Sequence, residues 1–501
     1  MARIAVIGAG TGALAAAARL AVAGHRVVVH ERTETYGGAV RRYERDGFGF
    51  DTGPGLLPLP AVWRDLFVKT GKEPLEACVD LVQVDPSSCH VFADGTRVSL
   101  PNASRAGVVT ALDEALGAGA GRRWGDFLVR AREAWDRTRR PLLEEPLWPN
   151  WQVLAEREPY PAVPHKRLLR TRRAGTLREI GAWELRDERL AGLLESFALD
   201  HGLDPRTAPA SAAVLPYLEH AFGTWYVRGG VRELARAVYE RCVARGVEFV
   251  FGSEVTGVVE KDGRAAGVEL ADGTVAEADH VVAGVDPVRL RSLTGRPPDG
   301  DGDVPAAPAE TGRFTLLLAL RGGREPHAAH RTVVHAPDRG AEPAFAAPPG
   351  DEGAARPTVT VLRPDDPALR PDDAHESAVV SAVAPADGAW EDEERVRRWT
   401  DLLLQAVRPA LPDLEERLLW HVAHTPGHAA EETGSPHGAV SAPALAAADG
   451  RFLHPANTTR LPGLYRVGGW SHPGGGLPHT GMSGALVAGL IVEGPEFRGS
   501  Q

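Results

Sequence analysis

The residues with the clearest chemical role lie near the start of the chain, where a glycine-rich turn follows a short apolar run. Residues 8–13 read GAGTGA. Gly8 allows a tight turn, and Gly10 has no side chain to keep a pyrophosphate away from the backbone. Gly12 and Ala13 are small enough for the following helix to pack closely on a strand. The N-terminus of that helix offers free N–H groups and a positive dipole end to phosphates. The pattern predicts a dinucleotide-binding turn.

An acidic residue follows where a dinucleotide requires one. An alanine-rich stretch that ends near Gly24 and the strand-like run 27–29 lead to Glu31, close to the usual spacing of about 20 residues for a carboxylate that accepts ribose hydrogen bonds. Strand, turn, helix and strand in this order are the context that the motif requires. The pair Gly37-Gly38 comes next. Proteins of the glutathione-reductase-like class that bind FAD carry such a pair, and plain NAD dehydrogenases usually lack it. A structural glycine-rich turn is the alternative.

A second glycine-rich segment lies near the other end of the chain. A strand is expected to end at Gly468, and the glycines 474–476 lead into a helix predicted over Thr480–Val492. The N-terminus of this helix can place N–H groups against an anionic ring, as a reduced flavin requires. His472 and His479 flank the glycines and are therefore the candidate catalytic residues. For His472, the alternative is a hydrogen bond to the backbone of a tight loop.

The intervening sequence predicts a chain that leaves the nucleotide-binding domain and returns to it. A second block after residue 225 combines a helix of about fifteen residues with several strands. Its expected strands are Val247–Phe251, two strands joined at Lys261-Asp262-Gly263, and His280–Val285, which follows an Asp272-Gly273 turn. Residues 104–199 are predicted to be mostly helical, and residues 89–100 to form a hairpin. Later features are strands between 313 and 383, loops at 297–308 and 337–356, and an amphipathic helix over 391–407.

The early part of the helical segment is rich in arginine and tryptophan. Its members are Arg122, Arg123, Trp124, Arg130, Arg132, Trp135, Arg137, Arg139 and Arg140. A solvated helix face is one interpretation, and a surface for peripheral contact with a membrane is the other.

Composition and charge exclude several classes of function. With 43% hydrophobic and 25% charged residues, the chain is neither disordered nor collagen-like. The net charge of −11 argues against general nucleic-acid binding, which needs a clustered positive field. No apolar run approaches the roughly 18 residues of a membrane span, and Met1-Ala2-Arg3 leads into a strand rather than a signal peptide. The cysteines, Cys78, Cys89 and Cys242, form no CxxC pattern, so we expect a cytoplasmic protein with reduced thiols and no metal site.

Taken in order, the motifs resemble one family. The chain is similar to the phytoene desaturase branch (carotenoid desaturases and isomerases) of the FAD-dependent amine-oxidase-like oxidoreductases. The matching blocks are residues 6–10 through 37–38, 46–54, 227–230, and 463–476. The sequence departs from many relatives at Ala39, where an arginine commonly follows the glycine pair; here Arg41 and Arg42 lie further on.

The resemblance implies an α/β fold with a Rossmann-like, glutathione-reductase-like FAD-binding domain and an interleaved α+β substrate domain. The FAD-binding domain would comprise residues 1–85, 225–290 and 450–495, and the substrate or lid domain residues 86–224 and 291–449. The residues expected to bind FAD are Gly8, Gly10, Gly12, Ala13, Glu31, Arg32, Gly37, Gly38, Gly53, Pro54, Val255, Gly469, Gly476 and Leu477. Trp225 and Tyr226 are candidates for an aromatic wall of the substrate pocket, with core packing as the alternative.

The activity implied by the resemblance is FAD-dependent desaturation, saturation or isomerisation of carbon–carbon bonds in a polyene or other lipophilic substrate, with hydride transfer to flavin N5. A second hypothesis is a flavin oxidase or dehydrogenase of a small biosynthetic metabolite or an amine. Amine oxidases usually place a lysine near the flavin, and here only Lys166 lies in a plausible substrate segment. A third hypothesis is a non-catalytic lipid-binding escort protein with the same fold.

Overall fold

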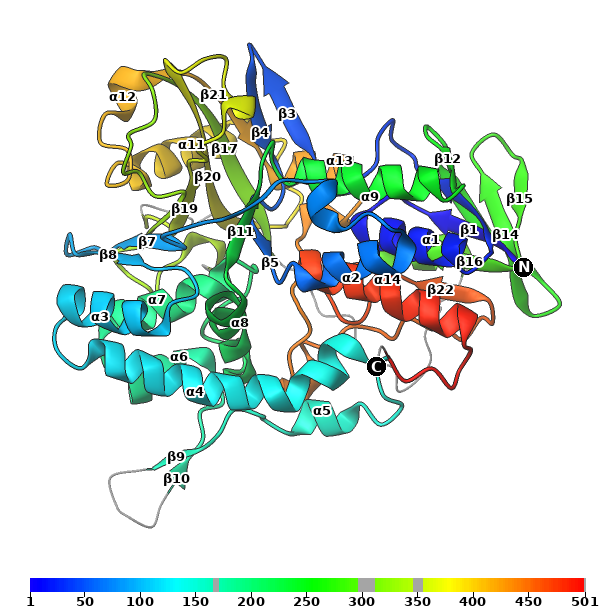
Figure 1. Ribbon diagram of the computed structural model, residues 1–501, viewed down its shortest axis with the longest axis horizontal. Coiled ribbons are helices and arrows are strands. Elements are labelled where there is room, and N and C mark those ends of the chain that lie inside the picture. Colours follow the sequence, from blue (N-terminus) through cyan, green and yellow to red (C-terminus); the bar gives the residue numbers. More distant parts are fainter. Residues whose placement is uncertain (165–170, 296–310, 346–354, 500–501) are drawn as a thin grey trace.

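The computed structural model describes residues 1–164, 171–295, 311–345 and 355–499. Lys166, the loop expected at 297–308 and part of the loop expected at 337–356 lie outside these ranges. Figure 1 shows three parts: a parallel sheet with its helices on the right, a larger sheet at the upper left and a layer of helices at the lower left.

A parallel sheet of five strands joins three distant stretches of the chain. In sheet order its strands are β12 (Glu248–Val250), β2 (Arg26–His30), β1 (Arg3–Ile7), β16 (His280–Ala283) and β22 (Leu464–Arg466). The central strand β1 is buried from Ile4 to Ile7, as expected for a parallel strand with both faces covered. The strands predicted from the sequence at these positions are present, with small differences in their bounds.

Three helices pack on this sheet and bring the two chain ends together. They are α1 (Thr11–Val22), α9 (Arg232–Ala244) and α14 (Leu477–Val492). The positive φ of Gly24, +89°, fits its predicted position just after the end of α1. Helix α14 starts directly after Gly476, three residues before the predicted start at Thr480. Since α1 packs on both α9 and α14, the first and last helices of the chain are neighbours.

A small antiparallel sheet extends from the second block. Its strands are β13 (Val255–Lys261), β14 (Arg264–Leu270) and β15 (Val275–Glu277). The β13–β14 turn has positive φ at both Asp262 and Gly263, the geometry of a tight two-residue hairpin turn. Strand β15 corrects the sequence prediction, in which the Asp272-Gly273 turn led directly to the strand at His280. With only three residues, β15 was too short to show an alternating pattern.

The larger sheet has seven strands and forms the upper left part of Figure 1. In order they are β21 (Leu418–His424), β17 (Thr311–Arg321), β20 (His375–Pro385), β19 (Val359–Leu362), β18 (Arg331–Val334), β7 (Ser88–Val91) and β8 (Arg97–Leu100). Helix α11 (Glu393–Ala406) buries Trp399 and Leu403 against this sheet, where Trp399 lies 5.7 Å from Phe314 between ring centroids. This is the apolar face predicted for the helix. Helices α12 (Leu414–Arg417) and α13 (Pro426–Thr433) flank β21.

Short elements connect the parallel sheet to the rest of the molecule. Strand β11 (Thr224–Val227) pairs with β5 (Leu57–Pro58) and β6 (Leu81–Gln83), and β3 (Arg42–Arg45) pairs with β4 (Phe48–Asp51). Helices α2 (Ala61–Thr70) and α10 (Pro287–Thr294) complete this region. Helix α2 packs against both α1 and α14.

The helical layer comprises the segment predicted to be mostly helical, residues 104–199, and a later helix, α8 (Val214–Phe222), that the prediction did not include. The other helices of this layer are α3 (Arg105–Leu116), α4 (Ala120–Arg139), α5 (Gln152–Glu156), α6 (Leu177–Ile180) and α7 (Glu188–Leu199). Wider helical turns follow α4 at Arg140–Glu144 and α6 at Gly181–Leu185. The prediction missed one interruption, the two-stranded ribbon of β9 (Val163–Pro164) and β10 (Thr171–Arg172). Two residues per strand give no periodic signal in the sequence.

Helix α4 and the turn after it contain the arginine- and tryptophan-rich stretch. Trp124 and Trp135 are buried in the helical core, whereas most of the arginines face outward. The outward arginines form ion pairs with neighbouring acids: Arg122–Asp126, Arg132–Asp136, Arg137–Glu133, Arg139–Glu144 and Arg140–Glu145. Because these pairs balance the positive charge locally, the structure favours the solvated helix face over an electrostatic membrane surface.

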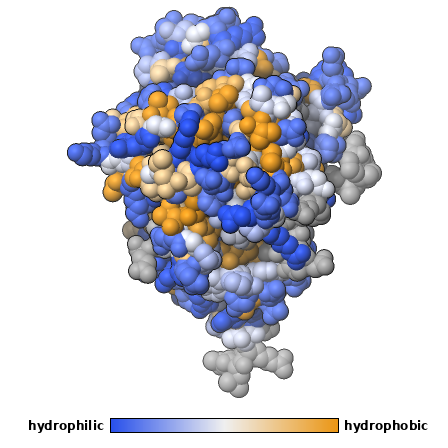
Figure 2. Space-filling model, turned by 90° about the vertical axis from the view of Figure 1, so that its right-hand side faces the viewer, coloured by the Kyte–Doolittle hydropathy of each residue, from blue (hydrophilic) through white to orange (hydrophobic). Residues whose placement is uncertain are grey.

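Among the described residues, no helix has both the length and the apolar character that crossing a membrane requires. On the face shown in Figure 2, apolar side chains lie among hydrophilic ones. The apolar side chains of the helical layer form one continuous core with a few residues of the C-terminal segment, such as Leu445 and Met482.

Candidate functional site

The two glycine-rich segments at opposite ends of the sequence lie against each other. A Cβ atom placed on Gly12 would lie 2.8 Å from Gly468 Cα and 3.0 Å from the Thr480 carbonyl oxygen. The hydroxyls of Thr11 and Thr480 are 3.1 Å apart. Helices α1 and α14 therefore begin at the same place, and their positive dipole ends meet there.

The first turn leaves open space directly over Gly10. This residue precedes α1 with an ordinary extended conformation (φ −68°), and no side chain caps the helix. A Cβ atom on Gly10 would have no neighbour within 4 Å. The glycine pair approaches from the other side, because Gly37 forms a bridge with Gly10 and a Cβ atom on Gly38 would lie 3.0 Å from Gly10 Cα. The backbone here is exposed to a ligand in the way that a pyrophosphate requires.

The Glu31 carboxylate lies beside this turn. It accepts a hydrogen bond from the Ala9 N–H at 2.8 Å and two from Thr33, from its N–H at 2.9 Å and its hydroxyl at 2.8 Å. Backbone bonds to Val250 and Ser253 fix Glu31 at the end of β2. An ionised carboxylate has about four lone-pair positions, so one remains for a ribose hydroxyl. Glu31 is 8% exposed, which keeps the carboxylate in one orientation.

Position 39 is an alanine, and two other arginines lie at the glycine pair: Arg41, and Arg232, which donates to the Val40 carbonyl at 2.9 Å. The Arg41 guanidinium donates to the Gly38 carbonyl at 3.0 Å, to the Thr33 hydroxyl at 3.1 Å and to the Glu432 carbonyl at 2.9 Å. Arg41 thus connects the glycine pair to helix α13. Arg32, also predicted to contact the cofactor, is exposed and donates to the carbonyl of Glu431 in the same helix.

The tail turn is held by polar residues that the sequence analysis did not identify. The buried Asn457 donates to the carbonyls of Arg466 and His472, at 3.2 and 2.8 Å, and to the hydroxyls of Ser471 and Ser483. Ser483 also accepts from the Gly468 N–H at 3.0 Å. These contacts span 9 to 26 residues, and no local sequence pattern indicates them.

Glycine is required in the tail turn for packing. A Cβ atom on Gly475 would lie 1.8 Å from the Ser441 carbonyl oxygen, and one on Gly469 would lie 3.4 Å from the Gly475 Cα atom. Ser441 itself donates its hydroxyl to the Gly469 carbonyl. Gly476, at φ +95°, is the residue before α14, and Leu477 is the first residue of that helix.

His472 is fixed by a hydrogen bond to a backbone carbonyl. A backbone hydrogen bond was the predicted alternative to a catalytic role for this residue. Its Nε2 atom lies 2.9 Å from the Glu145 carbonyl, whereas its Nδ1 atom is buried without a partner among the described residues. Burial lowers the pKa of this imidazole to about 4, so Nε2 carries the proton and donates to the carbonyl. The arrangement leaves His472 little freedom to reach a substrate.

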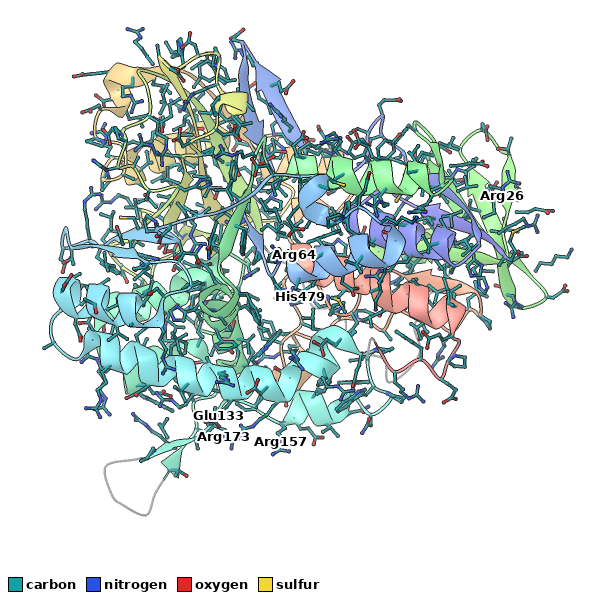
Figure 3. All side chains as sticks on the ribbon, viewed as in Figure 1. Arg26, Arg64, Glu133, Arg157, Arg173 and His479 are labelled. Carbon is teal, nitrogen blue, oxygen red and sulfur yellow. The ribbon has the colours of Figure 1, made fainter. Side chains whose placement is uncertain are left out.

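His479 lies in the first turn of α14 and points into an apolar pocket. Figure 3 shows it at the end of α14 that faces the helical layer. The pocket is lined by Trp135, Thr138, Arg139, Leu142, Leu143, Ser211, Val214, Leu215, Leu218, residues 443–446 and His479. Burial lowers the pKa of His479 to about 3, and the nearby imidazoles of His201, His454 and His472 add to this effect. The imidazole is therefore neutral at physiological pH.

The aromatic pair predicted to line the substrate pocket lies elsewhere. Tyr226 is buried and donates its hydroxyl to Asp366 at 2.7 Å, and this carboxylate also accepts from the Gly229 N–H. Trp225 is half-buried and donates to the Phe222 carbonyl at 3.1 Å. Neither side chain lines the pocket at His479, so their role in substrate binding stays a prediction.

The remaining predicted cofactor residues surround the same turns. Ala13 packs under the first turn, since a Cβ atom on Gly284 of the neighbouring strand would lie 3.4 Å from Ala13 Cβ. Gly53 is exposed beside Pro54, and a Cβ atom on Gly53 would lie 2.1 Å from the Ala39 carbonyl oxygen. Val255 starts β13, and its carbonyl accepts from Arg289 at 3.0 Å. The contacts of these residues with a cofactor stay predictions.

These features together fit a dinucleotide cofactor. Gly10 offers a cradle that a Cβ atom would fill, Glu31 offers a fixed carboxylate, and two helix N-termini converge on one place. The N-terminus of α14 has no side-chain cap, and uncapped N–H groups favour an anionic partner. FAD carries a pyrophosphate, ribose hydroxyls and a ring that becomes negative on reduction, and it matches each of these groups.

Comparison with known proteins points to the same cofactor. The profile of a protein family described as flavin containing amine oxidoreductase matches residues 14–492. A 4,4'-diapolycopene oxygenase from Methylomonas is 30% identical, with 98% of each chain covered. A hydroxyneurosporene desaturase from Cereibacter sphaeroides is also 30% identical over 98% of this chain and 97% of its own.

A solved structure shows the same fold. An oxidoreductase from Methanosarcina mazei superposes with a TM-score of 0.64 at 18% identity, covering 97% of this chain and 99% of the other. At this level of identity the likeness concerns the fold alone. It confirms the α/β, Rossmann-like class predicted from the sequence.

Proposed function

Because the chain belongs to the flavin-containing amine oxidoreductases and is an FAD-dependent oxidoreductase, we propose that it acts on carbon–carbon bonds of a polyene or similar lipophilic substrate. The observation that carries this proposal is the apolar lining around His479, to which α4 and α8 contribute side chains. The names of its relatives, an oxygenase of diapolycopene and a desaturase of hydroxyneurosporene, support a polyene substrate. The family resemblance predicted from the sequence is confirmed.

The chain's own residues prepare the reaction by binding the cofactor and by excluding water. The open backbone at Gly10 and the Glu31 carboxylate would hold the ADP half of the cofactor. The helix N-terminus at Gly476 and Leu477, where α14 begins, would stabilise the negative charge that develops on the ring. Bound FAD supplies a hydride acceptor at N5.

We infer that the apolar side chains around His479 would keep water away from a bound hydrocarbon. Leu142, Leu143, Val214, Leu215 and Leu218 offer no polar groups to a hydrocarbon. A substrate held there would present successive carbon atoms to the place where α1 and α14 begin, so positioning supplies a large part of the rate enhancement. The neutral His479 lies at this end of the pocket.

A reduction experiment tests the proposal. The purified holoenzyme should show flavin absorbance, and anaerobic addition of polyenes should bleach it. A panel that includes amines distinguishes the alternatives, because bleaching by amines alone would contradict a carbon–carbon bond substrate. A colourless protein that cannot be reconstituted with FAD would instead indicate the non-catalytic escort function.

Peripheral contact with a membrane stays a prediction. The ion-paired arginines are poor candidates for this contact, and an exposed aromatic residue at the edge of the pocket is a better one. Phe222 is 40% exposed and contacts Trp135, which lines the pocket, with ring centroids 6.3 Å apart. We infer that Phe222, rather than the ion-paired Arg132, contacts a lipid surface. Flotation with anionic liposomes should decrease for Phe222→Ser and stay unchanged for Arg132→Ala; equal flotation of both variants and the wild type would contradict this.

A further inference from the structure

His479 is a buried polar side chain without a partner. It is 8% exposed, its Nδ1 atom is fully buried, and neither ring nitrogen forms a hydrogen bond with any described residue. Most buried polar groups in native proteins are hydrogen-bonded, so such an exception requires an explanation. The comparison with His472 is informative, because the same α14 entry turn gives that histidine a backbone partner at 2.9 Å.

The other polar side chains of the pocket already have partners. Thr138 donates its hydroxyl to the Ala134 carbonyl at 2.8 Å, and Ser211 donates to the Ala446 carbonyl at 2.7 Å. Arg139 pairs with Glu144 at 3.2 Å. Among the described residues that line this pocket, His479 is therefore the one with a fully buried side-chain polar atom that has no hydrogen-bond partner, its Nδ1 atom.

The ionisation state of His479 defines what it can bind. Since burial lowers its pKa to about 3, the ring is neutral and offers one N–H donor and one acceptor nitrogen. A general base works best when its pKa lies near the operating pH. His479 is therefore suited to hydrogen bonding and poorly suited to proton abstraction, against the catalytic role predicted from the sequence.

We propose that His479 recognises a single oxygen function, a hydroxyl or carbonyl group, on an otherwise hydrocarbon substrate. This inference rests on the proposed function and adds to it a specificity-determining residue. The pocket walls select for a hydrocarbon, and the one free imidazole at the inner end selects for an oxygen atom close to the reacting bond. A purely hydrocarbon substrate would leave this imidazole unpaired, as it is in the free protein, and would gain no hydrogen bond there.

A binding comparison with the holoenzyme tests the proposal. Two polyenes of the same carbon skeleton, with and without a terminal hydroxyl group, are titrated and followed by their absorbance shifts. The wild type should bind the hydroxylated polyene about tenfold more tightly, as expected for one net hydrogen bond in a buried site. His479→Leu should bring the ratio of the two Kd values close to one, mainly by weakening the hydroxylated ligand.

A matched control comes from the same pocket. Thr138→Val keeps the shape of the side chain and removes a hydroxyl that is already bonded within α4, so the wild-type ratio should persist. If His479→Leu does not retain FAD, His479→Phe, which keeps a ring in the pocket, is measured in the same way.

The outcomes separate this inference from the proposed function. Equal affinities of the wild type for both polyenes, or an unchanged preference in the His479 variants, would overturn the inference while leaving a polyene substrate in place. Binding of neither polyene by the wild-type holoenzyme would overturn both.

Discussion

Alanine at position 10 should weaken cofactor binding without affecting the fold. Gly10 has φ −68°, which alanine adopts without strain, and a Cβ atom there would meet no protein atom within 4 Å. Alanine is a poorer residue than glycine before a helix, but it loses less backbone entropy on folding, and the two effects are of similar size. We therefore expect the free energy of unfolding of the apoprotein to change by less than about 0.5 kcal/mol.

The effect on FAD should be much larger. The added methyl group would lie between the backbone and the pyrophosphate and lengthen the hydrogen bonds from the first turn of α1. A hydrogen bond to a charged group contributes about 1.5–3 kcal/mol, so losing one weakens binding by about tenfold to a hundredfold. FAD at a hundred times its wild-type Kd stabilises the wild type by about 2.7 kcal/mol and should stabilise Gly10→Ala by only about 0.4–1.4 kcal/mol.

The assay is thermal unfolding of the apoprotein with and without FAD, and Gly12→Ala is the matched control. A Cβ atom on Gly12 would lie 2.8 Å from Gly468 Cα, so this variant should lower the Tm of the apoprotein itself. Gly10→Ala should keep the Tm of the apoprotein and lose most of the increase that FAD produces. A normal FAD-induced increase in the Tm of Gly10→Ala would refute the assignment of Gly10 to the pyrophosphate site.

Three further predictions concern individual side chains. Glu31→Gln removes the charge that we expect to face the ribose and should weaken FAD binding by about tenfold, measured by flavin fluorescence; unchanged affinity would mean that Glu31 serves only the hydrogen bonds from Ala9 and Thr33. Asn457→Ala removes several buried hydrogen bonds, including the one to the His472 carbonyl, and should lower the free energy of unfolding by about 2–4 kcal/mol in urea; a smaller loss would show that water replaces the amide. Burial lowers the pKa of His454 from 6.5 to about 4, so its contribution to stability is complete above pH 6.5 and is lost as the pH falls toward 4. His454→Gln should remove about 3 kcal/mol of this pH dependence relative to the wild type, and parallel stability curves for the two proteins would contradict the shift.

The sequence predicted those features that depend on short, regular patterns. Strand β1 (Arg3–Ile7) lies where the short apolar run before Gly8 predicted a strand, because four consecutive apolar residues before a glycine leave little choice. The hairpin turn at Asp262-Gly263 follows from residues that tolerate a positive φ. The fold class was predicted from the family resemblance of the motifs.

Contacts between distant segments could not be predicted in the same way. Asn457 holds the tail turn through Arg466, His472 and Ser483, yet a buried asparagine has no distinctive sequence neighbourhood. The position of Tyr226 against Asp366, 140 residues away, is of the same kind. Such contacts depend on which elements pack together, and the sequence alone predicted that packing only through family resemblance.

In the two turns, glycine serves two purposes that the sequence does not distinguish. It leaves space for a ligand at one position and allows two chain segments to pack closely at others. An added Cβ atom would meet nothing at Gly10, the tail backbone at Gly12, and the Ser441 carbonyl at Gly475. Gly12 and Gly475 are therefore required by the protein itself, because they allow the two chain ends to approach. That approach brings the first turns of α1 and α14 within 3.1 Å at their threonine hydroxyls, and two positive helix ends repel each other unless an anionic group lies between them. The packing glycines thus bring two positive helix ends together beside the open space at Gly10, and we propose that the pyrophosphate and the anionic ring of the cofactor bind at this junction of the chain ends.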